Sequence, residues 1–411
     1  MSRVLIVGGG TAGTAAAEEC AMQGADAMII DRLEEPEPPW ASWPDFLSSP
    51  EGQGRAVSGP VTRVDACASV RGTEIIAVRK GEAVASNGSL FRADSLVLAA
   101  GSRFEPPVAQ GLRKPGSFVL DSAARYKELG SASASADRIL ICGEGARGLQ
   151  VAERLSVRGT KVSLMVSCWQ PAKPSPPVLE VISDAARARG ISLVTGRVHR
   201  VVGLARAEAV IAGGEVVPCG ALAFVPRRIP VTVPLAGLLG RSGGVMVDRC
   251  LRASVPGVFA AGGCAELDGS LPPGVALDGE ARLTGRAAGA NSAGANVRIS
   301  AVRSWCLTVF GLRWSRAGPG ATTCGSLGMD LRAIGRRWHE DSACGLVYER
   351  NTGRVIGAEV VEPAGSPSAG LGCSASGSAT LKSLAYGCTG SSDISAISDT
   401  ARLGLTSWSG C

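Results

Sequence analysis

Short apolar runs that end in glycine turns recur along the chain, and a helical segment follows each of three such runs. The runs cover residues 4–7, 139–142 and 258–261. A run of apolar residues without polar alternation is typical of a strand buried on both faces of a parallel sheet. The segments that follow are rich in small residues and predict three helices. The first covers about 11–23, the second follows the glycine turn at 143–148 and ends at about 158, and the third covers 277–293. This pattern predicts an α/β fold with two Rossmann-like units of the doubly wound kind.

The first run leads into the pattern G-x-G-x-x-G, formed by Gly8, Gly10 and Gly13. In this pattern the first glycine makes the tight turn, the second lets the backbone approach a pyrophosphate, and the third lets the helix pack on the strand. Thr11 and Ala12 begin the helix, whose N-terminal N–H groups face the phosphates. A second strand over 27–30 ends on Asp31, which suits the ribose hydroxyls. The alternative is a glycine-rich turn in an unrelated fold, which the strand–turn–helix–strand–acid order makes the weaker interpretation.

A second unit of the same construction starts at residue 138. Its turn carries Gly143, Gly145 and Gly148, and its next strand covers 162–166. The spacing from the first glycine of the turn to the position at the end of the next strand is the same in both units, because 31 − 8 and 166 − 143 both equal 23. Val166 therefore stands where the first unit has Asp31, and it offers no hydrogen-bond acceptor to a ribose.

The remaining chain predicts an insertion and a third domain. Residues 61–99 alternate short apolar runs with turns, which is typical of a small antiparallel sheet. This insertion ends in a buried strand and a second glycine turn, Ala100-Gly101. The helix over 277–293 has glycine and alanine positions that would let a strand or a ligand approach closely. From about residue 304 the apolar runs 305–310, 345–348 and 355–361 predict an antiparallel sheet.

Composition excludes several classes of protein. The chain has 411 residues, 45% of them hydrophobic and 19% charged, which is typical of a globular protein of two or three domains. The net charge of +6 is scattered, so nucleic acid is not an expected partner. The 13 cysteines form no C-x-x-C pair and there are two histidines, so neither a metal site nor a disulfide framework is expected. With a strand almost at Met1 and no apolar run long enough to cross a bilayer, we expect a cytoplasmic protein without signal peptide or transmembrane segment.

Taken together, these motifs resemble the pyridine nucleotide-disulfide oxidoreductases, which are flavoproteins with two dinucleotide-binding domains. The resemblance rests on both fingerprints, on Leu-Ala-Ala-Gly-Ser at 98–102 and on Phe-Ala-Ala-Gly-Gly-Cys-Ala at 259–265. Residues 307–312 and 352–358 resemble the dimerisation domain of the NADH oxidase and coenzyme A-disulfide reductase branch. The resemblance implies FAD on the first unit, NAD(P)H on the second and a homodimer through an α+β C-terminal domain. The implied domains are 1–112 with 240–298 for FAD, 113–239 for NAD(P), and 299–411 for dimerisation.

The motif positions carry over as cofactor-binding candidates, residue by residue. The FAD set is Gly8, Gly10, Thr11, Ala12, Gly13, Asp31, Ala100, Gly101, Gly262, Gly263 and Cys264, and the NAD(P)H set is Gly143, Gly145 and Gly148. No catalytic residue is identified. Three positions depart from the family. Its Gly-Asp turn, whose carboxylate binds the ribityl chain of FAD, is Gly262-Gly263 here; the second ribose acid is Val166; and the redox cysteine aligns with Ala41.

Two functions follow from the resemblance and its departures. The first is an FAD-dependent NAD(P)H oxidoreductase that passes electrons directly to oxygen, a quinone, a dye or a carrier protein, without a thiol relay. The second is a redox-inactive or electron-relay flavoprotein subunit that acts through a protein partner. The glycine turns favour the first function, whereas the missing acids at Gly263 and Val166 motivate the second.

Overall fold

A computed structural model describes residues 2–35, 40–47, 67–105, 107–143, 145–165, 174–233, 237–267, 278–299, 304–318, 320 and 330–366. The chain divides into two compact units. The first unit consists of 1–42, 56–105 and 228–303, and the second consists of 43–55, 106–227 and 304–411. No helix within the described ranges is long and apolar enough to span a membrane.

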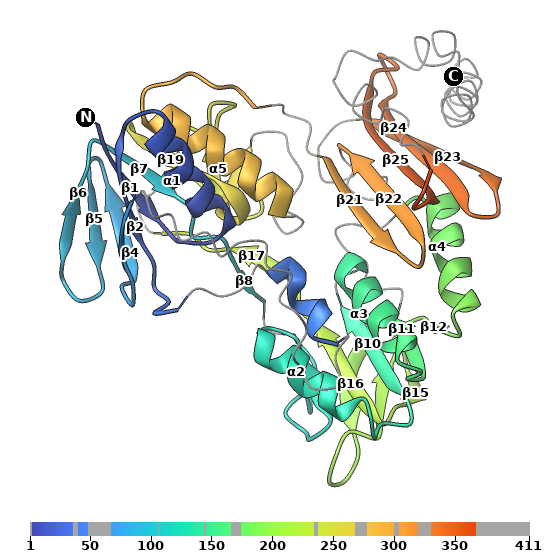
Figure 1. Ribbon diagram of the computed structural model, residues 1–411. Coiled ribbons are helices and arrows are strands. Elements are labelled where there is room, and N and C mark those ends of the chain that lie inside the picture. Colours follow the sequence, from blue (N-terminus) through green and yellow to red (C-terminus); the bar gives the residue numbers. More distant parts are fainter. Residues whose placement is uncertain are drawn as a thin grey trace. The chain divides into compact units, whose positions relative to one another are not determined.

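The first unit is built on a five-stranded parallel sheet (Figure 1). Its strands, in spatial order, are β19 (Val258–Ala260), β7 (Ser95–Leu98), β1 (Arg3–Val7), β2 (Asp26–Ile30) and β3 (Ala68–Val70). The central strands β1 and β7 are almost wholly apolar and buried, as the continuous apolar runs predicted. The predicted antiparallel insertion is present but shorter, as β4 (Ile75–Arg79), β5 (Glu82–Ala85) and β6 (Leu90–Arg92), because β3 pairs parallel with β2 and belongs to the main sheet.

Two helices lie side by side in this unit, α1 (Thr11–Met22) and α5 (Asp278–Ser292) (Figure 1). Their backbones approach so closely that a Cβ atom at Gly285 or Gly289 would collide with the main chain of Ala12 or Ala16. The thiol of Cys20 donates to the carbonyl of Gly289 over 3.5 Å. Gly285 and Gly289 of α5 therefore accommodate another helix, which the sequence did not indicate.

Two short pairs of strands complete the first unit. β8 (Ser102–Phe104) pairs antiparallel with β17 (Arg228–Pro230), and β18 (Val245–Val247) pairs parallel with β20 (Ala265–Leu267). The carboxylate of Glu266 on β20 is buried and accepts hydrogen bonds from the main chain and the hydroxyl of Ser242. A short 3₁₀ turn, η3 (Gly262–Cys264), connects β19 to β20.

The second unit contains a second parallel sheet. Its order is β12 (Ser192–Val194), β11 (Val162–Met165), β10 (Ile139–Gly143), β16 (Ala221–Val225) and β9 (Ser117–Val119). Its helices are α2 (Ala123–Ala132), α3 (Gly145–Val157) and α4 (Pro176–Ala188). A three-stranded antiparallel sheet is inserted between β12 and β16, made of β13 (Val198–Val202), β14 (Ala209–Ala212) and β15 (Glu215–Pro218).

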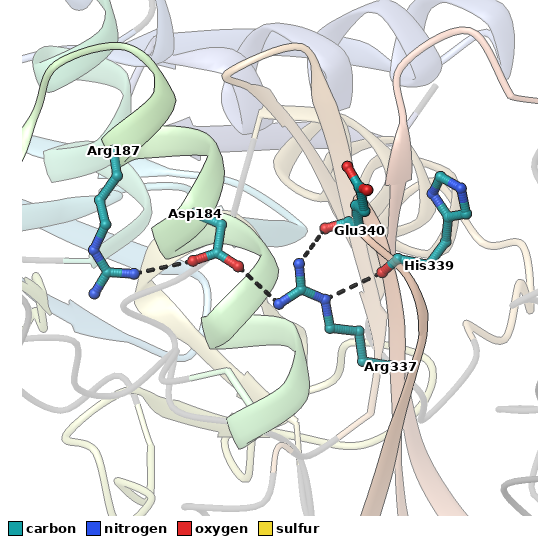
Figure 2. A network of polar contacts seen from close by, with 5 residues as sticks. All are labelled: Asp184, Arg187, Arg337, His339 and Glu340. Carbon is teal, nitrogen blue, oxygen red and sulfur yellow. Dashed lines mark hydrogen bonds and ion pairs between the residues drawn. The ribbon is translucent and has the colours of Figure 1, made fainter.

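The C-terminal part of the second unit is the antiparallel sheet that the apolar runs predicted. Its strands, in spatial order, are β21 (Ser304–Val309), β22 (Leu312–Ala317), β25 (Val355–Pro363), β24 (Ser342–Glu349) and β23 (Leu331–His339). Helix α4 is tied to the edge strand β23 by an ion pair between Asp184 and Arg337, with N–O distance 2.7 Å (Figure 2). Arg187 shares the same carboxylate, and the guanidinium of Arg337 also reaches the carbonyls of His339 and Glu340.

Candidate functional site

The first glycine turn lies at the C-terminal end of β1, where ligands bind in open parallel sheets. Gly8 has φ +105°, and a Cβ atom there would collide with the carbonyl of Ala99. A Cβ atom at Gly13 would collide in the same way with the carbonyl of Gly8, because α1 packs directly on the turn. These two positions therefore require glycine for the reasons the fingerprint implies. Gly10 is the N-cap residue of α1, and no side chain caps this helix.

Asp31 follows β2 at the same edge of the sheet, and its carboxylate binds the glycine turn that follows β1. Its Oδ2 accepts a hydrogen bond of 2.5 Å from the main-chain N–H of Gly9, and its Oδ1 accepts one of 2.8 Å from that of Leu33. A carboxylate has about four acceptor positions, so the remaining lone pairs can receive ribose hydroxyls. The sequence predicted the position of Asp31 but not its contact with Gly9.

Two further turns meet the same edge from the other side of β1. The turn after β7 carries Ala100 and Gly101, and the turn after β19 carries Gly262 and Gly263. The main-chain N–H of Gly262 donates over 3.0 Å to Oγ1 of Thr284 on α5, which fixes this turn. The sequence alone did not indicate Thr284, because a threonine inside a helix gives no signal of its contacts.

Cys264 is buried between these two turns. Its thiol donates to the carbonyls of Leu98 and Ala261, both at 3.3 Å. Burial raises the pKa of this thiol, although main-chain N–H groups of the turns oppose the shift. Cys264 therefore packs as a small apolar residue. The first unit thus brings together all eleven residues of the predicted FAD set.

The edge of the first sheet has the room and the donors that a dinucleotide needs. A Cβ atom at Gly10 or at Gly101 would meet no atom within 4 Å, in contrast to the crowded Gly8 and Gly13. Open backbone beside an uncapped helix N-terminus provides free N–H groups for a pyrophosphate. Asp31 provides the acceptor for ribose hydroxyls. These residues fit FAD, except that Gly263 contributes no carboxylate.

The second turn has the same construction in the second unit. Gly143 has φ +125° at the end of β10, and a Cβ atom there would collide with the carbonyl of Val225 on the neighbouring strand β16. Gly148 lies on α3 above the side chains of Leu164 and Ile141, at 3.7 and 4.0 Å from its Cβ position. Gly145 begins α3. The structure therefore brings the three glycines of the predicted NAD(P)H set to one turn, which fits a pyrophosphate. Val166 lies outside the described residues.

The aromatic segment η1 (Trp40–Leu47) follows β2 and Asp31 in the sequence. The ring of Trp43 is buried and contacts that of Tyr126 edge-to-face, with 6.0 Å between centroids. The carboxylate of Asp45 pairs with Arg154 on α3 at 2.9 Å, and Lys127 lies 5.0 Å above the ring of Phe46. Trp43 and Phe46 therefore cover a core edge within the second unit. The side chains of 40–42, Ala41 included, are not among those described.

Neither a metal centre nor a reactive thiol cluster is apparent in the described ranges. They contain no group of three or more His, Cys, Asp and Glu side chains placed to hold a metal ion. Of the eight cysteines in these ranges, six are buried, Cys67 is half-buried and Cys306 is exposed. Burial raises the pKa of Cys219 to about 11.

Comparison with known proteins places these turns in a family. A family model described as pyridine nucleotide-disulphide oxidoreductase matches residues 2–313. A curated relative, the "Nitric oxide reductase FlRd-NAD(+) reductase" of Aeromonas salmonicida, is 27% identical over 194 residues, which cover 44% of this chain and 48% of the relative. A "5,5'-dehydrodivanillate O-demethylase ferredoxin reductase subunit" of a Sphingobium species is 28% identical over 290 residues, 64% of this chain and 67% of that protein. The chain thus spans about half the length of the first of these relatives.

Among solved structures, the water-forming NADH oxidase of Lactobacillus brevis bound to NADH has the same fold. Its TM-score is 0.80 at 18% identity, and the superposition covers 100% of this chain and 99% of the oxidase. The likeness therefore includes the C-terminal sheet as well as the two parallel-sheet regions. It confirms the predicted fold class.

Proposed function

The chain belongs to the pyridine nucleotide-disulphide oxidoreductase family, and from this premise we propose that it passes electrons from NAD(P)H through FAD directly to an acceptor. The observation that carries the proposal is the pair of glycine turns, at Gly8 and Gly143, each at the C-terminal edge of its own parallel sheet. Two such turns in one chain fit two dinucleotides. Family membership confirms the resemblance stated from the sequence, and it supports the expected class of enzyme and the expected pair of cofactors.

The role of the chain in this reaction is to bind and orient. FAD, when bound, supplies an electron-accepting ring system that protein side chains lack. Asp31 would hold the adenosine ribose, Gly8 and Gly10 the pyrophosphate, and Gly101 with Gly262 the opposite half of the molecule. Gly143, Gly145 and Gly148 would hold the pyrophosphate of NAD(P)H. The N-terminal ends of α1 and α3 add a positive dipole to each phosphate site.

The proposal includes no thiol relay. Ala41 has no sulfur where the family's redox cysteine would stand. Cys264, which follows the FAD turn, is 1% exposed and has a raised pKa because of burial. A thiol relay needs an accessible thiolate of low pKa. Cys264 has neither property, so electrons would leave the reduced cofactor directly.

We propose a carrier protein as the acceptor to test first. Two relatives support this choice by name, one as an FlRd-NAD(+) reductase and one as a ferredoxin reductase subunit. Oxygen, quinones and dyes remain in the screen. With oxygen the expected product is hydrogen peroxide, because no sulfenic acid can form at Ala41 to reduce it further.

The domain roles are proposed with the function. We assign FAD binding to 1–112 and 240–298, NAD(P) binding to 113–239 and dimerisation to 299–411. The homodimer is proposed from the family resemblance of the C-terminal domain.

An acceptor screen tests the proposed function. FAD-loaded protein is supplied with NADH or NADPH and, side by side, with oxygen, a one-electron dye, a quinone, ferredoxin, coenzyme A disulfide and glutathione disulfide. We expect turnover with at least one acceptor that is not a disulfide, and this turnover should persist after cysteine alkylation. Turnover with disulfides alone, abolished by alkylation, would overturn the direct transfer.

A further inference from the structure

Ser102 lies next to the glycine that stands in the place of the family's carboxylate. A Cβ atom built on Gly263 would lie 3.0 Å from Oγ of Ser102 and 3.4 Å from its Cβ. Ser102 begins β8, directly after the turn that follows β7. Residues 102 and 263 are far apart in the sequence, so their contact depends on the adjacency of β7 and β19 in the sheet.

The strand order places this pair at the end of the site opposite to Asp31. The order is β19, β7, β1, β2, β3, so Asp31 follows β2 on one side of the central turn, and Ser102 and Gly263 follow β7 and β19 on the other. Neighbouring strands are about 4.8 Å apart. A dinucleotide laid along this edge, with its ribose at Asp31 and its pyrophosphate at Gly8 and Gly10, extends its other half toward Ser102.

The main chain of Ser102 is held firmly, whereas its hydroxyl is available. Its carbonyl accepts a hydrogen bond of 3.2 Å from the guanidinium of Arg228, and β8 is paired with β17. The residue is half-buried. Its Oγ makes no hydrogen bond within the described part of the chain. A polar hydroxyl at fixed backbone, beside open space at Gly101, is placed to bind a ligand group.

We propose that the hydroxyl of Ser102 binds the ribityl side of FAD and occupies the place that the carboxylate has in relatives with a Gly-Asp turn. This inference rests on the proposed function, because it concerns the same cofactor site. A serine hydroxyl both donates and accepts hydrogen bonds, so it can pair with the hydroxyls of a polyol chain. Being neutral, it binds more weakly than a carboxylate would. The site therefore retains FAD, with one neutral contact in place of a charged one.

The test measures binding of FAD and of ADP to the cofactor-free chain. The variants are Ser102→Ala, Ser102→Thr, which keeps the hydroxyl, and Ser89→Ala, a control at an exposed serine in the β5–β6 turn of the same unit. Fluorescence titration gives the dissociation constant of FAD, and competition gives that of ADP, which carries only the adenosine half. Circular dichroism and thermal unfolding without cofactor report on the fold.

We expect Ser102→Ala to weaken FAD binding about fivefold, as the loss of one neutral hydrogen bond implies. ADP binding and the unfolding temperature should stay unchanged. Ser102→Thr and Ser89→Ala should bind FAD like the unmodified chain. An equal loss of FAD and ADP affinity would overturn the proposal, because the residue would then support the turn and not the ribityl side. So would a loss in Ser102→Thr as large as in Ser102→Ala.

The same titration distinguishes a wrong role for Ser102 from a wrong proposed function. If the unmodified chain binds FAD and Ser102→Ala binds it equally well, the role of Ser102 is wrong and the proposed function stands. If the unmodified chain binds ADP but not FAD, or binds neither, the proposed function fails and the role of Ser102 fails with it.

Discussion

Ser175 and Glu359 are joined by a hydrogen bond of 2.6 Å from the main-chain N–H of Ser175 to Oε1 of Glu359, across 184 residues of sequence. Ser175 is the N-cap residue of α4, and Glu359 lies on β25 of the C-terminal sheet. The other carboxylate oxygen of Glu359 is 2.5 Å from the guanidinium of Arg316. Both charged side chains are at most 5% exposed. One carboxylate therefore caps α4 and neutralises a buried arginine.

Glu359→Ala should destabilise the second unit strongly. The substitution removes the Glu359 carboxylate from the buried guanidinium of Arg316, and breaking such a pair costs about 3–5 kcal/mol. Hydrogen exchange of β24 and β25 amides measures the effect where it arises. Glu82→Ala is the matched control, because Glu82 pairs with Arg92 at the surface and such pairs contribute about 0–1 kcal/mol. Equal, small effects of both substitutions would contradict the role of Glu359.

Gly10→Ala should separate cofactor binding from folding. A Cβ atom at Gly10 meets no protein atom within 4 Å, so the fold should tolerate alanine with a loss of about 0.5–1 kcal/mol, the cost of alanine relative to glycine at an N-cap. The added methyl group would occupy the space assigned to the pyrophosphate, and we expect FAD affinity to fall about tenfold or more. Isothermal titration and thermal unfolding measure the two effects.

Gly24→Ala is the control for Gly10→Ala, because it should lower stability and leave FAD affinity unchanged. Gly24 ends the α1 region with φ +73° and open surroundings. Alanine there is strained by about 1 kcal/mol and should lower stability without changing FAD affinity. If Gly10→Ala binds FAD normally, the pyrophosphate does not lie at this turn.

Gly263→Asp should tighten FAD binding once room is made for it. An aspartate Cβ would lie 3.0 Å from Oγ of Ser102, so the hydroxyl must move. In the Ser102→Ala background this contact is absent, and a charged acceptor is worth about 1.5–3 kcal/mol. We expect Gly263→Asp to improve affinity about tenfold or more relative to Ser102→Ala alone. A smaller gain in the Ser102 background is expected, and the double-mutant cycle measures the difference.

Alkylation should modify few of the described cysteines. Cys306 is exposed, whereas Cys264 and Cys219 are buried with pKa values raised by burial. Because only the thiolate reacts, Cys219 should stay unmodified in the folded chain until the pH approaches about 11. Mass spectrometry after iodoacetamide treatment at increasing pH checks this order. Early modification of Cys264 would show that the thiol beside the FAD turn is reactive after all.

Val166→Glu should shift nucleotide preference toward NADH. Val166 occupies the register position of Asp31 in the second unit, and it lies outside the described residues. An acid there would accept the ribose hydroxyls of NADH and repel the 2′-phosphate of NADPH. The ratio of kcat/KM for the two nucleotides measures the shift. An unchanged ratio would mean that residue 166 is not at the ribose.

The sequence predicted features that local pattern determines and missed those that depend on tertiary packing. Gly8, Gly13 and Asp31 were predictable because turn, helix and acid follow one another within one βαβ unit. The contact of Ser102 with Gly263 was not, because it arises only when β7 and β19 become neighbours in the sheet. Nor was the close approach of Gly285 to Ala12, since a small residue on a helix does not identify its partner.

Strand β23 is a second feature that the sequence pattern did not predict. It carries Arg332, Arg336 and Arg337 around a glycine and has no regular alternation, so no apolar run marks it. Its pairing with β24 and the ion pair of Arg337 with Asp184 stabilise a strand that its own sequence favours only weakly.

Transfer of electrons from NAD(P)H through FAD is tested most directly by an anaerobic titration of the FAD-loaded, cysteine-alkylated protein with NADH and then NADPH, monitored by the flavin absorption spectrum. We expect a yellow protein whose flavin band is bleached in proportion to the nucleotide added and returns when an acceptor is admitted. A protein that stays yellow with both nucleotides, or that is bleached only before alkylation, would contradict the direct transfer of electrons from NAD(P)H through FAD.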